Sequence, residues 1–130
     1  MAKRKILIVD DEPDFLAVMS TRLMANDYEV VTAADGEEAL GYVKNNKPDA
    51  VLLDILMPGM DGLEVLRRIR KIDEGMPVYI ITAFSTDERF KVANSLGASG
   101  FIVKTDDLAK EVDNITSALN VSARFRKKDK

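Results

Sequence analysis

Five short apolar runs, separated by segments long enough for one helix each, constrain the fold of this chain more than any other feature. They cover residues 6–9, 30–34, 50–53, 78–81 and 101–103, and their starts lie 20 to 28 residues apart. Each run is nearly continuous rather than alternating, which is typical of parallel strands that helices cover on both faces. Because strands and helices alternate, the sequence predicts a parallel sheet with right-handed crossovers.

The segments between these runs show helical periodicity. Pro13 suits the first position of a helix, and Gly97 follows the fourth helix, expected over about residues 87–96. The sequence therefore predicts a single doubly wound α/β domain of the (βα)5 type, with a five-stranded sheet. Apolar residues recur every three or four positions, as on one helix face: Leu16, Met19 and Leu23; Leu66 and Ile69; Leu108, Val112, Ile115 and Leu119.

The length of 130 residues suits one domain, and the composition excludes several kinds of chemistry. The chain has no cysteine, which rules out disulfides, thiol nucleophiles and thiolate metal sites. It also has no histidine, so it holds no Ser-His-Asp triad, imidazole base or histidine-ligated zinc. Proton or phosphoryl chemistry in this chain must rest on carboxylates, lysines, hydroxyls and a metal ion.

Charge is distributed unevenly along the chain. The chain has 19 basic and 22 acidic residues, of which the stretch 122–130 holds five basic residues and one acidic residue. Residues 1–121 therefore hold 14 basic and 21 acidic residues, a net charge of −7. An acidic body is a poor surface for nucleic acid. We expect one domain over residues 1–121 and a basic C-terminal tail or linker stub over residues 122–130. With no signal peptide and no apolar stretch of about 18 residues, the sequence predicts a soluble, cytoplasmic protein without a membrane partner.

Charged and hydroxyl side chains directly follow four of the predicted strands: Asp10, Asp11 and Glu12; Asp54; Thr82, before Ala83; and Lys104. In a doubly wound sheet, the carboxyl ends of the strands form the ligand crevice. If the strand order is 2-1-3-4-5, Asp10, Asp11 and Asp54 converge, and their charges repel unless a cation lies among them. A hard divalent ion with oxygen ligands, Mg²⁺, is the natural occupant, and Lys104 brings the formal charge near zero.

Each of these residues also has a purely structural explanation. An acidic helix start alone would account for residues 10–12 through the helix dipole, Lys104 could extend its charge to solvent, and Thr82 could simply end a strand. Asp54 decides between the explanations, because a charge directly after the apolar residues 50–53 is costly without a partner. We therefore interpret Asp54 as functional and expect Lys104 to pair with the acids.

Together these motifs resemble the receiver domains of two-component response regulators, the CheY-like family. The resemblance covers about residues 4–121 and rests on four separated segments in the family's order. These are ILIVDDE at 6–12, DILMPGMDG at 54–62, ITA at 81–83, and residues 97–104, which begin with Gly-Ala and end with Lys104. It implies a flavodoxin-like sheet in the order 2-1-3-4-5, which a chemotaxis member of the family has.

The resemblance implies the chemistry of the site. Asp54 would attack a phosphohistidine of a sensor histidine kinase or phosphotransfer protein and form an aspartyl phosphate. Asp11, Asp54 and the backbone carbonyl of Leu56 would ligate Mg²⁺, for which Mn²⁺ can substitute, and Asp10 would act mainly through bound water. A type II turn at residues 57–60 would direct the Leu56 carbonyl toward the metal. The carboxylate is already ionised and needs no base, so the chain is a phosphoacceptor rather than an ordinary enzyme.

The resemblance also implies a switch. Lys104, Thr82 and the backbone of Ala83 would contact the phosphoryl group. Movement of Thr82 would let Phe101 turn inward and change the surface of helix four, strand five and helix five, which signals to an output domain or downstream protein. From the residues alone, Phe101 is an ordinary half-buried strand aromatic. A monomer or a weak homodimer through this surface is compatible with the pattern.

Three positions depart from the family pattern or vary within it. Thr105 stands where the family usually has a proline, often after a cis bond, so we expect the Lys104–Thr105 bond to be trans or strained. Leu56 and Phe84 occupy positions that influence hydrolysis of the phosphoryl group in the family. Both are apolar and cannot orient water, which predicts slow self-dephosphorylation.

Three other functions fit the sequence less well. A phosphatase of the haloacid dehalogenase type needs a second aspartate where Leu56 stands. A flavin carrier would bind phosphate after the first strand, where residues 10–12 would repel it. A receiver-like docking module that is never phosphorylated is the serious alternative, and retention of the complete acidic site argues against it.

Overall fold

Strand order and pairing in the computed structural model confirm the predicted sheet. The structure describes residues 3–57, 59–83, 86–104, 110 and 113–120. Five parallel strands lie in the order β2-β1-β3-β4-β5. Four strands extend one residue beyond a predicted end and β2 is shifted by one, so Asp54 and Thr82 belong to strands. The bounds are β1 (Lys5–Val9), β2 (Glu29–Ala33), β3 (Ala50–Asp54), β4 (Val78–Thr82) and β5 (Gly100–Val103).

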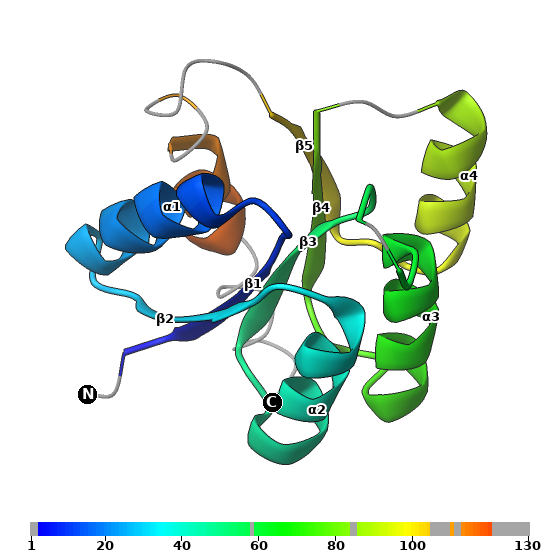
Figure 1. Ribbon diagram of the computed structural model, residues 1–130, viewed down its shortest axis with the longest axis horizontal. Helices are drawn as coiled ribbons and strands as arrows, with labels where there is room; N and C mark the ends of the chain where they lie inside the picture. The colour runs from blue at the N-terminus through cyan, green and yellow to red at the C-terminus, as the bar shows by residue number, and fades with distance from the viewer. Residues whose placement is uncertain (1–2, 58, 84–85, 105–109, 111–112, 121–130) are drawn as a thin grey trace.

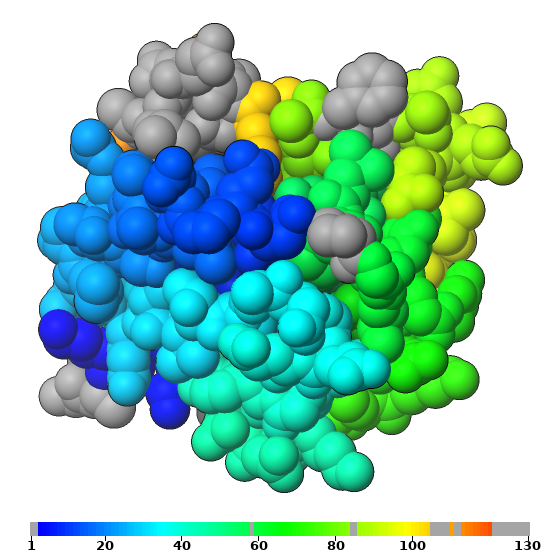
Figure 2. Space-filling view, viewed as in Figure 1, coloured from blue at the N-terminus to red at the C-terminus, as the bar shows by residue number. Residues whose placement is uncertain are grey.

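Helices cover both faces of this sheet. On one face lie α1 (Pro13–Ala25) and a helical segment over residues 113–120; on the other lie α2 (Gly36–Asn46), α3 (Gly62–Ile72) and α4 (Asp87–Ser95) (Figure 1). Seen from the same side in Figure 2, side chains of α1, α2 and α3 fill much of the face turned toward the viewer. In the part of the chain that the structure describes, no helix has the length and apolar character needed to cross a membrane.

Burial on both faces explains why the strand sequences are continuously apolar. Along β1, Leu7 and Val9 pack toward α2 and α3, whereas Ile6 and Ile8 pack toward α1 and residues 113–120. Alternate side chains of a strand point to opposite faces, so both sets are apolar when both faces are covered. The predicted helix stripes are buried at Met19, Leu23, Leu66, Ile69, Ile115 and Leu119, with Leu16 half-buried; Leu108 and Val112 lie outside the described residues.

Local signals set the ends of the helices. Pro13 begins α1 as predicted, and Gly97 follows α4 with φ +79°, a conformation that glycine adopts without strain. Asp61 caps α3, because its Oδ1 accepts a hydrogen bond from the Leu63 amide at 2.9 Å. Because the strands are parallel, the loops after β1, β3 and β4 lie at the same edge of the sheet.

Candidate functional site

The strand register brings acidic side chains together at the carboxyl edge of the sheet. Val9 of β1 lies opposite Leu53 of β3, so the next residues, Asp10 and Asp54, are neighbours. Both are almost fully buried, with 1% and 4% of their surface exposed. Buried carboxylates are rare unless they are paired, because removing a charge from water is costly. This pair therefore indicates a site that supplies compensating positive charge.

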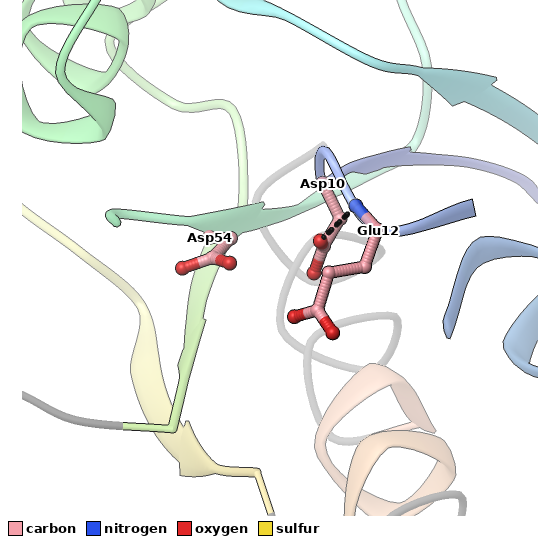
Figure 3. Close-up of side chains that lie close together, drawn as sticks. All are labelled: Asp10, Glu12 and Asp54. Carbon is pink, nitrogen blue, oxygen red and sulfur yellow. Dashed lines mark hydrogen bonds between the residues drawn. The ribbon is translucent and has the colours of Figure 1, made fainter. Parts of the chain in front are cut away.

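Glu12 completes the acidic group in this structure. Carboxylate oxygens of Asp10, Glu12 and Asp54 lie within 4.8 Å of one another, and the side chains extend from the end of β3 and from the segment after β1 (Figure 3). The Glu12 amide donates to Asp10 Oδ1 at 2.9 Å, a turn that brings the Glu12 side chain over the site. Asp11, expected to ligate the metal, is exposed and outside this group, and its metal role stays a prediction.

Lys104 lies among these acids, as the sequence predicts. Its Nζ is 2.5 Å from Asp10 Oδ2, 2.9 Å from Glu12 Oε1 and 3.1 Å from Asp54 Oδ2, and only 9% of its side chain is exposed. The ammonium also lies over the Phe15 ring, 4.3 Å from its centroid. One lysine therefore serves three carboxylates, which leaves a formal charge of −2.

The electrostatics of the site follow from burial. Burial raises the pKa of the Asp54 carboxyl, an effect that the Leu56 amide and Lys104 partly offset and the Asp10 charge reinforces. For Lys104, burial acts to lower the pKa, but the contacts with Asp10 and Glu12 and the Asp54 charge outweigh it and hold the pKa above its usual value. Lys104 therefore holds its proton firmly, and ionisation of Asp54 costs free energy.

The donor set fits a hard divalent cation. Asp10 Oδ2 is buried and accepts no hydrogen bond from the described residues, although it forms the ion pair with Lys104. Carboxylate oxygens are the preferred ligands of Mg²⁺, and two positive charges would balance the remaining −2. We conclude that the acidic group can bind such an ion once Lys104 gives up part of its contacts.

The segment after β3 is held close to the carboxyl group. The Leu56 amide donates to Asp54 Oδ1 at 2.9 Å, while the Leu56 side chain is exposed. Gly59 has φ +80°, as the third residue of a type II turn requires; Pro58, expected at the second, lies outside the described residues. A Cβ on Gly62 would lie 2.5 Å from the Asp54 carbonyl oxygen, so only glycine lets α3 begin here. Sequence reasoning did not identify this close approach.

The expected switch residues, Thr82 and Phe101, lie on the neighbouring strands β4 and β5. Thr82 is buried at the end of β4, and its carbonyl accepts the Lys104 amide at 2.9 Å; Ala83 follows and is exposed. Phe101 is 37% exposed, and its ring meets Phe90 of α4 edge-on with centroids 4.8 Å apart. The predictions for Phe84 and for the Lys104–Thr105 bond involve residues outside the described ones.

Comparison with known proteins identifies the family. Residues 6–116 match the model of the response regulator receiver domain. The chain belongs to this family. It is 37% identical to the transcriptional regulatory protein PrrA of Mycobacterium tuberculosis over 115 residues, and this alignment covers 88% of this chain and 49% of PrrA. It is 36% identical over 119 residues to the sporulation initiation phosphotransferase F of Bacillus subtilis, which covers 92% of this chain and 96% of that protein.

Solved receiver structures have the same fold as this receiver domain. A CheY-like receiver domain protein from Methanospirillum hungatei aligns with a TM-score of 0.86 and 29% identity, over 94% of this chain and 98% of that chain. The response regulator TrrA from Thermotoga maritima, solved in complex with Mg²⁺-BeF, aligns with a TM-score of 0.78 and 33% identity, over 88% and 98%. The chain spans less than half the length of PrrA, so only the receiver portion of that regulator is comparable.

Proposed function

We propose that this receiver domain accepts a phosphoryl group on Asp54 from a phosphohistidine of a sensor histidine kinase or phosphotransfer protein. The observation that carries the proposal is a buried Asp54 carboxylate held between the Leu56 amide and Lys104, beside Asp10, in a chain of the receiver family. One relative, 36% identical to this chain, is named a phosphotransferase, which agrees with a role in phosphoryl transfer. The chain acts as a phosphoacceptor in signalling, and catalysis is limited to its own phosphorylation and slow dephosphorylation.

The transfer is a displacement at phosphorus. A carboxylate oxygen of Asp54 attacks the phosphorus, the P–O bond forms, and the P–N bond breaks with its electron pair passing to the imidazole nitrogen, which the donor's surroundings protonate. Because Asp54 is already ionised, no base is required. Lys104 exchanges part of its carboxylate contacts for a phosphoryl oxygen, and Thr82 and the backbone of Ala83 contact the others. Preorganised positive charge of this kind is the main source of catalysis in phosphoryl transfer.

The proposed metal site combines the loop after β1 with the end of β3 and the residues that follow it. We assign Asp11, Asp54 and the Leu56 carbonyl as direct ligands of Mg²⁺, and Asp10 as a ligand through water, with Mn²⁺ as a substitute. When bound, the ion offsets the negative charge of the phosphoryl oxygens. The buried Asp10 Oδ2 and the formal charge of −2 support this assignment, as does the Mg²⁺-BeF complex of TrrA.

Phosphorylation would act outward through Thr82 and Phe101. Drawing Thr82 toward the phosphoryl group lets the partly exposed Phe101 leave its contact with Phe90 and turn inward, which alters the surface formed by α4, β5 and the helix that includes residues 113–120. We place the receiver unit at residues 1–121 and a basic tail or linker at residues 122–130. Signalling then passes to an output domain or downstream protein, in the cytoplasm and without direct nucleic-acid binding, from a monomer or weak homodimer.

A mass measurement tests the proposal. Incubation with acetyl phosphate and Mg²⁺ should add about 80 Da, the mass of HPO₃, to the wild-type protein. Asp54→Asn should gain no such adduct, and the matched control Asp113→Asn, at an exposed aspartate, should gain it fully. Equal adducts on the wild type and Asp54→Asn, or none on the wild type, would contradict the proposal. Absence of an adduct on the wild type would support the alternative, a docking module that is never phosphorylated. Nothing in the geometry of the site points to that alternative.

A further inference from the structure

Arg89 of α4 joins two points of the loop that follows Asp54. Its Nη2 donates to the Ile55 carbonyl oxygen at 3.2 Å and to Asp61 Oδ1 at 2.7 Å. Ile55 is the residue after Asp54, and Asp61 immediately precedes α3. A single amino group therefore bridges the start and the end of the loop formed by residues 55–61.

Both contacts involve parts of the loop that are anchored in other ways. The Ile55 carbonyl also accepts the Gly62 amide at 3.3 Å, and the Ile55 side chain is buried. The Asp61 oxygen that meets Arg89 is the same oxygen that caps α3 through the Leu63 amide. The guanidinium thus adds to an existing backbone closure and ties that closure to α4.

The surroundings of Arg89 distinguish it from ordinary surface arginines of this domain. Its side chain is 29% exposed and its Nε is fully buried. Arg67, in contrast, is 48% exposed and pairs with Glu64 one turn away on the same helix. Exposed pairs within one helix contribute little, whereas a covered guanidinium shared between a carboxylate and a backbone carbonyl holds separate elements in one arrangement.

We propose that Arg89 is a positioning residue that holds α4 against both ends of the 55–61 loop and thereby sets the place of the Leu56 carbonyl. The consequence for the metal rests on the proposed function, in which that carbonyl is a ligand. Because α4 belongs to the surface that responds to phosphorylation, the same contact makes the position of α4 depend on the loop beside Asp54. Neither ligand nor acceptor, Arg89 acts through the backbone that it holds.

The first test needs neither metal nor phosphoryl group. Hydrogen exchange of the unmodified protein in EDTA should be about fivefold faster in Arg89→Met at the amides of Leu63, Glu64 and Val65, because local opening of the first turn of α3 becomes easier. Arg67→Met removes the same charge and an exposed ion pair, and should leave these amides within about twofold of the wild type. Equal exchange in the two variants would overturn the proposal.

The second test measures the position of the loop. In calorimetric titrations, the Mg²⁺ dissociation constant should rise about fivefold in Arg89→Met and by less in Asp61→Asn, which keeps the cap oxygen but removes the charge that Arg89 pairs with. It should not rise in Arg67→Met. The double variant should lose no more Mg²⁺ affinity than Arg89→Met alone, since the charge at position 61 acts on the loop only through Arg89. Additive losses, or unchanged Mg²⁺ affinity, would overturn the proposal. A wild type that neither binds Mg²⁺ nor gains the adduct would contradict the proposed function instead, and hydrogen exchange would still decide the role of Arg89.

Discussion

At the carboxyl edge of the sheet three carboxylates share one lysine, whereas at the amino edge polar side chains form separate pairs with backbone or amide groups. There the Tyr79 hydroxyl donates to the Ala118 carbonyl at 3.0 Å, and Asp49 Oδ2 accepts the Lys5 amide at 2.7 Å. Neither pair places like charges together, so each stabilises the fold without requiring a further ion.

The carboxyl edge has the opposite character. Asp10 and Asp54 are buried beside each other, and both depend on Lys104 for compensating charge. Binding of a cation stabilises such a site, because it compensates the buried negative charge. Lys104 can also exchange a carboxylate partner for a phosphoryl oxygen when Asp54 is phosphorylated. Groups that stabilise the fold and groups that can respond to a ligand therefore lie at opposite ends of the same strands. Substitutions of carboxylates at the two edges should differ in sign, and substitutions at the carboxyl edge alone should be sensitive to metal.

The largest effect is expected from Lys104→Met. It leaves two buried carboxylates without a cation, so the free energy of unfolding in EDTA should fall by about 3 kcal/mol, and Mg²⁺ should restore part of the loss. Phosphorylation by acetyl phosphate should slow by about 100-fold or more. Urea denaturation with and without Mg²⁺ measures the first effect and intact mass against time the second. Lys44→Met, at an exposed lysine of α2, is the control, and equal stabilities of the two variants in EDTA would disprove the account.

A smaller effect of opposite sign is expected from Asp54→Asn. Burial raises the pKa of Asp54 in the folded state, so ionisation of this group destabilises the fold above that pKa, and stability is regained as pH falls through it. In EDTA at pH 7, Asp54→Asn should therefore raise the free energy of unfolding by about 1 kcal/mol. Denaturation at a series of pH values should show the gain shrinking toward pH 4.

The amino edge supplies the matched control for that substitution. Asp49→Asn removes a charge that accepts the Lys5 amide, so it should lower rather than raise the free energy of unfolding, by about 0.5–1 kcal/mol. Stabilisation by both aspartate substitutions would show that net charge, and not the local crowding of carboxylates, explains the Asp54 result.

The smallest effect separates fold from function. Tyr79→Phe loses the hydrogen bond to the Ala118 carbonyl and should lower the free energy of unfolding by about 0.5 kcal/mol, with Mg²⁺ affinity and phosphorylation unchanged. Thermal denaturation and calorimetric titration of the same preparation measure both quantities. A loss of Mg²⁺ affinity here would show that the two edges of the sheet are coupled.

Much of this arrangement was predictable because it rests on local or repeating patterns. Continuous apolar runs predicted the parallel strands, and Pro13 and Gly97 predicted where helices begin and end. The order of the strands came from the family resemblance, because spacing alone does not say which strands are neighbours. The position of Asp54 directly after the apolar residues 50–53 was enough to indicate a functional carboxylate, because a charge there needs a partner.

Other features depend on contacts between distant segments. The sequence favoured Asp11 as a neighbour of Asp10 and Asp54, but the turn after β1 brings Glu12 to Lys104 and leaves Asp11 exposed. The direction of a side chain in a loop follows from backbone angles, which the residue types alone do not specify. Nothing in the sequence near Arg89 indicated its contacts with Ile55 and Asp61, some thirty positions earlier.

The sequence by itself determined the alternation of strands and helices, the two-sided core and the residue types available for chemistry, because these follow from apolar periodicity and composition. Only the tertiary structure decided which carboxylates share Lys104 and how closely α3 approaches Asp54 at Gly62. It also decided that Arg89 joins α4 to the loop formed by residues 55–61. The physical reason is that electrostatic and steric interactions depend on distances of a few ångströms between groups far apart in the chain, and folding alone sets those distances.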